Sequence, residues 1–258
     1  MSALRLAITC LRAKGSYTRS VRSKTTLPYY GRSHSKVLAE NSKLFELIIH
    51  DVKPECESSY WPLVEKELTR ISADKNLPVS LVGSWGTLVG KNLDQATHVL
   101  AYEDGYKGKT NCLDALSRDK EWQMFSRESG KLVNRRKSSL LYEFTFWPEI
   151  VPTNRGWIFE MRTYNLKSGS LIEWGQAWRQ GIYYRGSNNE AVHGWFAQIG
   201  QLHIVYHLWT YPDLVQRRET RQLAWNTPGW DDCVINTVPL IITMDTAILS
   251  AASFSPLK

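Results

Sequence analysis

Two stretches of the chain carry a histidine and a tyrosine at a spacing that could support chemistry. They contain His98 and Tyr102 in one case, and His207, Trp209 and Tyr211 in the other. Residues two apart in a β-strand point to the same face of a sheet, so each set shares one face. We predict that both sets line a pocket between two sheets. Imidazole and phenol groups there could act as acid and base, or bind haem.

A non-catalytic interpretation of the same histidines competes with this one, and we favour it. A repeated strand histidine usually forms a hydrogen bond with a backbone group or a carboxylate, and Glu46 and Glu160 are the repeated candidates. The chain contains no Gly-x-Gly-x-x-Gly, P-loop, His-Glu-x-x-His or Gly-x-Ser-x-Gly motif. Its 4 cysteines include no Cys-x-x-Cys pair. We therefore predict no catalytic residue, no metal site and no cofactor.

A third candidate lies near the middle of the chain, at Trp147-Pro-Glu-Ile150. Autophagy modifiers bind aromatic-x-x-aliphatic peptides of this kind by strand addition, and the proline favours an extended backbone. Trp147 could instead close the first sheet, because large aromatic rings fill the space between packed layers. Trp147 and Ile150 are thus a candidate partner-binding motif.

The positive charge of the chain is concentrated at its N-terminus. Residues 1–43 contain nine Lys or Arg and one acidic residue, so this segment has a formal charge of +8. The formal charge of the whole chain is +7, so the remaining residues together carry −1. The segment is rich in Ser and Thr, and Leu4, Ile8 and Leu11 would share one helical face. This composition is typical of a mitochondrial transit peptide, with a disordered basic tail as the alternative. The nearly neutral body argues against a nucleic-acid partner.

Two smaller basic clusters lie in the body of the chain. Arg135-Arg-Lys137 is predicted to form a solvated turn, and Arg217, Arg218 and Arg221 a solvated helix face of mixed charge. No uncharged run is long enough to cross a bilayer, so the mature protein is expected to be soluble or peripheral to a mitochondrial membrane.

An internal repeat organises the remaining sequence. Phe45-Glu46 recurs as Phe159-Glu160, Trp85 and Gly90 recur as Trp195 and Gly200, and His98–Asp104 recurs as His207–Asp213. A period of this length indicates two whole domains. We predict a leader over residues 1–42, a first α/β-barrel half over 43–147, a linker over 148–156 and a second half over 157–258.

Each copy has the hydrophobic pattern of a β-α-β-β-α-β unit. Strands are predicted over 45–52, 79–89, 96–102 and 139–147, and helices around 60–71 and over 111–125. The second copy has predicted strands over 157–166 and 237–249, a hairpin around Gly200, and helices over 170–184 and 214–225. Such a unit is α+β, with both helices on one face of an antiparallel sheet, and two copies can cover each other face to face.

Several of these motifs resemble the NIPSNAP family. They are Ala115–Trp122, Phe159–Tyr164, Ile172–Gly175, Ile199–Leu202, His207–Trp209 and the C-terminal Ser253-Phe-Ser-Pro-Leu-Lys258. Trp147-Pro148 and the C-terminal motif look most like the third homologue group, whereas Ile172–Gly175 looks more like the first two. The resemblance implies two tandem ferredoxin-like domains packed as an intramolecular dimeric α/β barrel.

The resemblance also implies a mitochondrial protein that acts through protein partners, in vesicular transport or in recruiting autophagy receptors, with a homo-oligomer possible. It supplies no catalytic residues. The alternative is a small-molecule or haem-binding barrel with weak oxidative or isomerase activity. A tightly packed apolar space between the sheets would favour the first hypothesis, and an ordered polar cavity containing His207 and Tyr211 the second.

Overall fold

Each half of the chain forms a four-stranded antiparallel sheet with helices on one face. The structure, a computed structural model, describes residues 43–185 and 190–258, and the predicted leader lies outside this range. The first half comprises β1 (Leu44–Val52), α2 (Glu57–Ala73), β2 (Val79–Val89), β3 (Gln95–Tyr102), α3 (Gly105–Arg118), α4 (Lys120–Leu132) and β4 (Val133–Glu143). A 3-10 turn, η1 (Pro54–Cys56), precedes α2.

The second half has the same order of elements. It comprises β5 (Ile158–Leu166), α5 (Leu171–Arg185), β6 (Ala191–Ile199), β7 (Ile204–Tyr211), α6 (Leu214–Trp225), α7 (Trp230–Thr237) and β8 (Ile241–Ala251), with a 3-10 turn, η3 (Val238–Leu240), before β8. The last helix differs most between the halves, because α7 has 8 residues where α4 has 13.

The eight strands close into one barrel in the order β1-β3-β2-β8-β5-β7-β6-β4. The two half-sheets join at both edges, where Trp85 of β2 pairs with Ala251 of β8, and Glu143 of β4 pairs with Trp195 of β6. This confirms the predicted α+β barrel of two ferredoxin-like halves. The halves therefore share edge hydrogen bonds in addition to facing each other across the interior.

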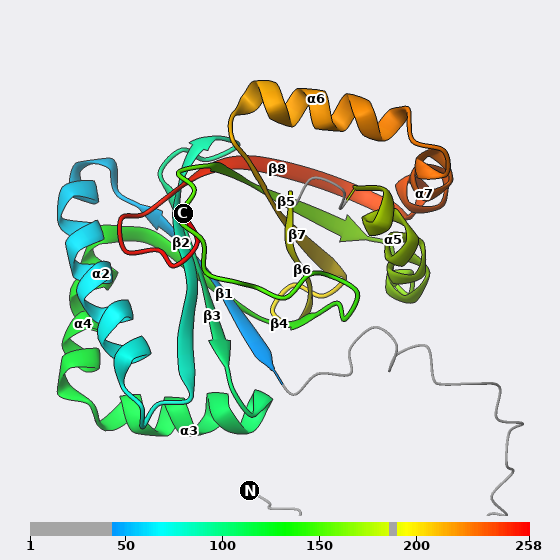
Figure 1. The fold of residues 1–258 in the computed structure, drawn as a ribbon. Coiled ribbons are helices and arrows are strands. Elements are labelled where there is room, and N and C mark those ends of the chain that lie inside the picture. Colours follow the sequence, from blue (N-terminus) through cyan, green and yellow to red (C-terminus); the bar gives the residue numbers. More distant parts are fainter. Residues whose placement is uncertain (1–42, 186–189) are drawn as a thin grey trace, which may run out of the picture. The chain divides into compact units, whose positions relative to one another are not determined.

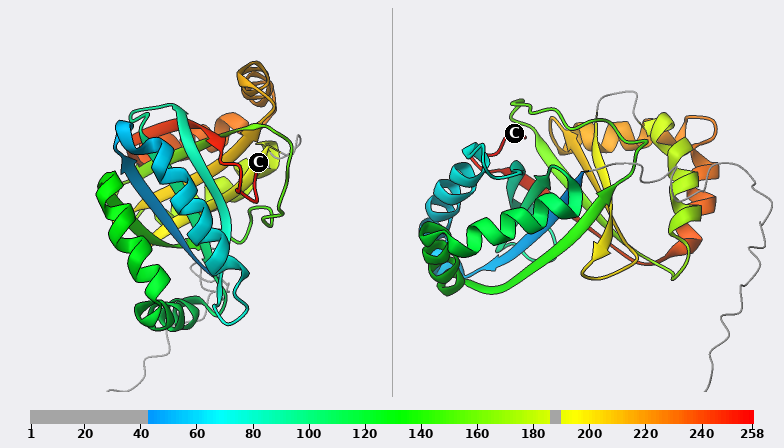
Figure 2. Two further views of the ribbon diagram at one scale, coloured as in Figure 1. Left: turned by 90° about the vertical axis from the view of Figure 1, so that its left-hand side faces the viewer. Right: turned by 90° about the horizontal axis from the view of Figure 1, so that it is seen from below.

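The core has three layers. Apolar residues that point inward from all eight strands fill the barrel, and a separate apolar cluster lies under the helices of each half. Figure 1 and Figure 2 show α2, α3 and α4 outside the sheet of the first half, and α5, α6 and α7 outside that of the second. The central strands β3 and β7 are buried on both faces because a helix layer covers one side and the barrel interior the other.

Two predicted elements differ from the structure in the first half. The helix predicted over 111–125 is two helices that meet at Asp119, whose backbone is extended and whose carboxylate accepts a hydrogen bond from the backbone N–H of Trp122. Asp119 thus caps a new helix, which the apolar spacing alone does not indicate. The last strand begins at Val133 and ends at Glu143, so it includes Arg135 to Lys137 and excludes Trp147.

Candidate functional site

The five residues predicted to line a pocket between the sheets lie instead on the outer, helix-covered faces. His98 packs beside Tyr60 of α2, and His207 packs beside Trp174 and Trp178 of α5. The alternate residues of the same strands fill the barrel, as Val99 and Ala101 do. The prediction of one shared pocket between the sheets is therefore wrong, because β3 and β7 are buried on both faces and these residues lie on the helix side.

His98 belongs to a buried hydrogen-bond network of the first half. Its Nε2 lies 2.7 Å from the Tyr60 hydroxyl, and its Nδ1 lies 2.8 Å from Ser84 Oγ. The same tyrosine hydroxyl lies 2.7 Å from Nδ1 of His50. A hydroxyl has one proton, so Tyr60 donates to one ring and accepts from the other. Burial lowers the pKa of His50 to about 4 and that of His98 to about 3, so both rings are neutral at pH 7.

His207 occupies the equivalent position in the second half but has no hydrogen-bond partner among the described residues. The ring is 0% exposed, and neither nitrogen is bonded. The ring centroids of Trp178, Trp147 and Tyr164 lie 4.5, 4.6 and 5.0 Å from that of His207. Burial holds the pKa of His207 well below its usual value. Since aromatic rings surround it closely, a haem iron could reach this histidine only if the cage opened.

The difference between the two histidines follows from three substitutions between the copies. The strand registers and the helix starts align His50, Tyr60 and Ser84 with Tyr164, Trp174 and Gly194. None of the three replacements is hydrogen-bonded to His207, and Trp147 packs directly over Gly194.

The tyrosines of the two predicted sets belong to other networks. Tyr102 donates a 2.6 Å hydrogen bond to Glu46, which also accepts one from Lys109. In the second half, Arg217 donates two hydrogen bonds to Glu160, at 2.9 and 2.7 Å. The two repeated glutamates are therefore occupied by other groups and do not bind the histidines as expected.

Glu160 is 0% exposed and also accepts a hydrogen bond from Thr246. Burial alone would raise the pKa of Glu160, but the hydrogen bonds from Arg217 and the charge of Arg162 outweigh it and lower the pKa. The prediction of a wholly solvated face on α6 is thus wrong for Arg217, which reaches inward to a buried carboxylate.

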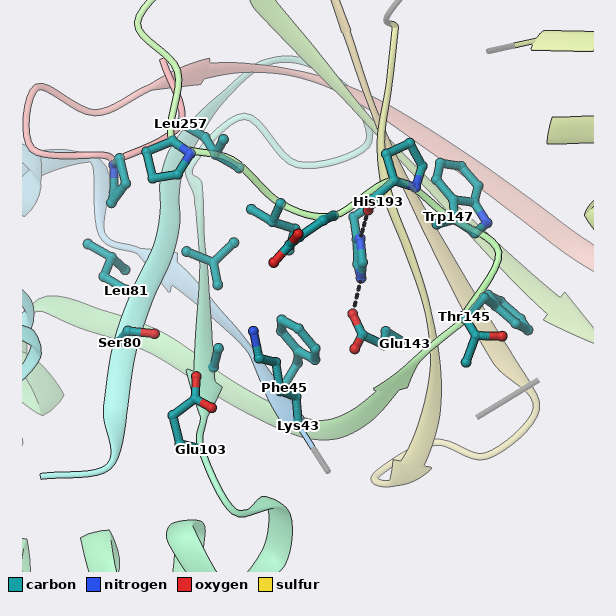
Figure 3. A pocket seen from close by; sticks show the side chains of 18 residues that line it. Lys43, Phe45, Ser80, Leu81, Glu103, Glu143, Thr145, Trp147, His193 and Leu257 are labelled. Carbon is teal, nitrogen blue, oxygen red and sulfur yellow. Dashed lines mark hydrogen bonds and ion pairs between the residues drawn. The ribbon is translucent and has the colours of Figure 1, made fainter. Parts of the chain in front are cut away.

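A pocket of about 520 Å³ lies at one end of the barrel (Figure 3). Phe45, Val82 and Ala101 form part of its wall, and the linker after β4 and the C-terminal tail form the rest. The linker and the tail hold each other, since the backbone N–H of Lys258 donates to the Thr153 carbonyl and that of Thr153 donates to the Pro256 carbonyl. The pocket is therefore bounded by strands of the first half, by the linker in the middle of the chain and by the C-terminal tail.

His193 is the only histidine among the residues that line this barrel-end pocket. Its Nδ1 lies 2.8 Å from the carbonyl oxygen of Pro148, and its Nε2 lies 2.9 Å from a carboxylate oxygen of Glu143, as Figure 3 shows. Both neighbours offer oxygen atoms that accept hydrogen bonds. His193 thus fastens the linker to β4 and β6 and is not a free base.

His193 was not predicted from the sequence, because the candidate histidines were those that recur in both copies and His193 occurs in one copy only. At the repeat offset of that region, the first copy has Gly83 where the second has His193.

No described group of His, Cys, Asp and Glu side chains is arranged to hold a metal ion. Among the helices of residues 43–185 and 190–258, none is both long enough and apolar enough to cross a membrane.

The predicted partner motif forms part of the same wall. Trp147 is 6% exposed and packs against the rings of His207 and Trp209, whereas Ile150 is partly buried against the barrel interior. A peptide-binding domain could bind Trp147 and Ile150 only after residues 147–150 detach from the barrel. Their role in partner binding stays a prediction.

The fold and the barrel-end pocket define a tandem ferredoxin-like protein of the dimeric α/β-barrel class. A solved structure of a putative monooxygenase from Lactobacillus acidophilus has the same fold, with a TM-score of 0.60 at 11% identity over 82% of this chain and 94% of that one. An anthrone oxidase-like protein also has a TM-score of 0.60, at 10% identity over 84% of this chain and 94% of that one. At these identities the likeness shows the fold alone.

The family model of NIPSNAP matches residues 45–148 and 159–256, and the chain belongs to this family. It is 45% identical to Protein NipSnap homolog 2 of Danio rerio, over 88% of this chain and 79% of that protein, and 39% identical to Protein NipSnap of Drosophila melanogaster, over 87% and 82%. Identity to Protein NipSnap homolog 3A of Homo sapiens is 24%, over 95% and 98%. The family prediction is confirmed. The predicted similarity to the third group is not supported, because identity to homolog 2 is 45% and identity to homolog 3A is only 24%.

Proposed function

We propose that this chain is a mitochondrial NIPSNAP-type protein that works through contacts with other proteins and not as an enzyme. Its finer role would be in vesicular transport or in recruiting mitophagy receptors. The observation that supports this proposal is the packing of the barrel interior. Trp85, Phe159 and Trp195 are each at most 1% exposed and lie within one apolar cluster. These side chains fill the space between the two sheets, and the cavities of about 520 and 440 Å³ lie instead at the barrel end and under the helices of the second half.

The state of the candidate acid and base groups supports the same conclusion. Both ring nitrogens of His98 are within hydrogen-bond distance of hydroxyl groups, and both of His193 lie beside acceptors. His207 is enclosed by aromatic rings. A general base must reach the proton that it removes, which none of these three histidines can do without rearrangement.

Proximity labelling in cells, with the leader intact, tests this proposal. The labelling enzyme should not be fused to the C-terminus, because Leu257 is 2% exposed and the Lys258 backbone pairs with Thr153. It should be inserted after Gln201, in the exposed turn between β6 and β7, where an insertion disturbs little packing.

The expected result is the labelling of a defined set of mitochondrial proteins. The matched control is the same insertion in a chain that begins at Lys43, which should lose this set if residues 1–42 direct the protein to mitochondria. Identical labelling with and without the leader would argue against the proposed location. A labelled set no different from that of a freely diffusing matrix protein would argue against specific protein contacts.

A further inference from the structure

The second half contains a cavity of about 440 Å³ between the outer face of its sheet and its three helices. Five tryptophans and several aliphatic side chains line it, together with three arginines. The tryptophans are Trp174, Trp178, Trp209, Trp225 and Trp230, and the arginines are Arg162, Arg185 and Arg221. A largely apolar cavity of this size with a few converging polar groups is the usual form of a small-molecule site.

The three arginines have no counterpart in the first half. Arg162 pairs with His207 as Ile48 pairs with His98 across the sheet. Arg185 and Ile71 occupy the same position counted from the starts of α5 and α2. The equivalents of Arg162 and Arg185 are thus Ile48 and Ile71. Arg221 aligns with Cys112 when counted from the starts of α6 and α3, and with Leu113 when counted from the cation that binds the repeated glutamate. Three apolar positions of one copy are cationic in the other, and all three line one cavity.

The two carboxylates nearby, Glu160 and Glu190, neutralise only part of this charge. Glu160 is already held by two hydrogen bonds from Arg217, and Arg162 lies 3.9 Å from the same carboxylate. The Nε of Arg162 is buried without a hydrogen-bond partner in the described chain. Arg185 lies 3.4 Å from Glu190 and donates to the hydroxyl of Tyr211.

Arg221 has neither a hydrogen bond nor an ion pair with any residue in the described ranges, although it is only partly exposed. Burial and the charges of Arg162 and Arg185 lower the pKa of its guanidinium, with Glu160 opposing them. Burying a cation without a partner is unfavourable, so an anion placed here would be bound strongly.

We propose that this cavity binds a small amphipathic anion, with its acidic head between Arg162 and Arg221 and its apolar body among the tryptophans. A guanidinium donates paired hydrogen bonds to either a carboxylate or a phosphate, so the head is one of these two groups. Trp225 is 60% exposed, so the ligand could enter beside α6. This site is separate from the barrel-end pocket and shares the rings of Tyr164, Trp174 and Trp178 with the enclosure of His207, which itself does not line it. The proposal goes beyond the role in protein contacts.

The test uses the fluorescent probe anilinonaphthalene sulfonate, which combines an aromatic body with one negative charge. It should accept excitation energy from the tryptophans of the full chain, and decanoate or decyl phosphate should displace it. Decanol is the matched neutral competitor and should displace it at least about tenfold less well, because a hydrogen bond to a charged group is worth about that factor or more. The acid that displaces the probe at lower concentration identifies the head group.

Two variants of the same helix decide whether the arginines matter. Arg221→Leu, which places an apolar residue at this position as in the first half, should weaken decanoate or decyl phosphate about tenfold or more. Arg218→Leu removes the same charge from the exposed face of α6 and should leave affinity within about twofold. Val238→Trp, at the exposed rim of the cavity, should block binding without a change of charge.

The proposal is overturned if the probe does not bind, if decanol competes as well as the acids, or if Arg221→Leu binds as the unchanged chain does. Circular dichroism of each variant must match that of the unchanged chain, and Val238→Trp provides an independent arm if Arg221→Leu alters the fold. None of these results depends on the labelling experiment, so failure of one proposal leaves the other intact.

Discussion

Replacing the two equivalent histidines by leucine should change stability in opposite directions. At His98 the substitution leaves the hydroxyls of Tyr60 and Ser84 each short of a buried partner, which costs about 1–3 kcal/mol per group. Tyr60 keeps its bond to His50, so the net loss should be about 2–4 kcal/mol.

At His207 the same substitution removes two buried nitrogens that have no partner among the described residues. Each unsatisfied polar group is unfavourable by about 1–3 kcal/mol, whereas lost ring contacts cost about 0.5–1.5 kcal/mol. We expect His207→Leu to stabilise the protein by about 1–3 kcal/mol. The difference between the variants should be about 3–7 kcal/mol, and the apolar gain cancels because both receive the same side chain.

The free energy of unfolding should be measured by urea denaturation at pH 7.5, followed by circular dichroism. Tryptophan fluorescence would be a poor signal, since three tryptophans lie within 6.1 Å of the His207 ring centroid. Equal denaturant dependence of the two variants would permit a direct comparison. Equal losses at both positions would refute the reasoning, as would a loss of more than about 1 kcal/mol for His207→Leu.

Three further predictions follow from buried groups. Stability should fall as pH drops from about 6.5 toward 4, because the pKa values of His50 and His98 are about 4 and about 3 in the folded protein and return to the ordinary value on unfolding. The free energy of unfolding from urea denaturation should fall by about 1.4 kcal/mol per pH unit for each histidine. A free energy of unfolding that does not change with pH would contradict this. Glu160→Gln should cost about 3 kcal/mol in the same assay, because the partly buried Arg217 guanidinium loses the charge of its fully buried carboxylate partner, and a loss below about 1 kcal/mol would argue against it. Gly194→Ala should displace Trp147, whose ring occupies the position of the added Cβ, so near-ultraviolet dichroism should weaken; an unchanged spectrum would mean that the ring moves freely.

Much of the fold could be predicted from the period-two apolar pattern and from the internal repeat. The pattern places Phe45 and Phe159 on equivalent strands, and the structure puts both inside the barrel. The side of the sheet could not be predicted for His98 or His207, because β3 and β7 are buried on both faces. Alternation distinguishes a core face from a solvent face, but it does not distinguish two cores.

The candidate sites were harder to predict for a related reason. His193 has no repeated counterpart, and its function as a clamp depends on Pro148, a linker residue brought close by the barrel's closure. Arg217 and Arg221 were expected to be solvated because α6 reads as a polar helix of mixed charge. Their burial depends on how α6 and α7 cover the sheet, which is a tertiary property that helix periodicity does not contain.

The edge pairing of β2 with β8 and of β4 with β6 joins two halves that could have been two identical chains. In a homodimer with twofold symmetry every mutation occurs twice, so a change useful on one side must be tolerated on the other. Fusion into one chain removes this constraint. One half can keep its polar network around His98 as a stable framework. The other half has Gly194 at the position of Ser84 and Arg162 at the position of Ile48. Symmetry breaking within one chain is thus what allows a single half to specialise.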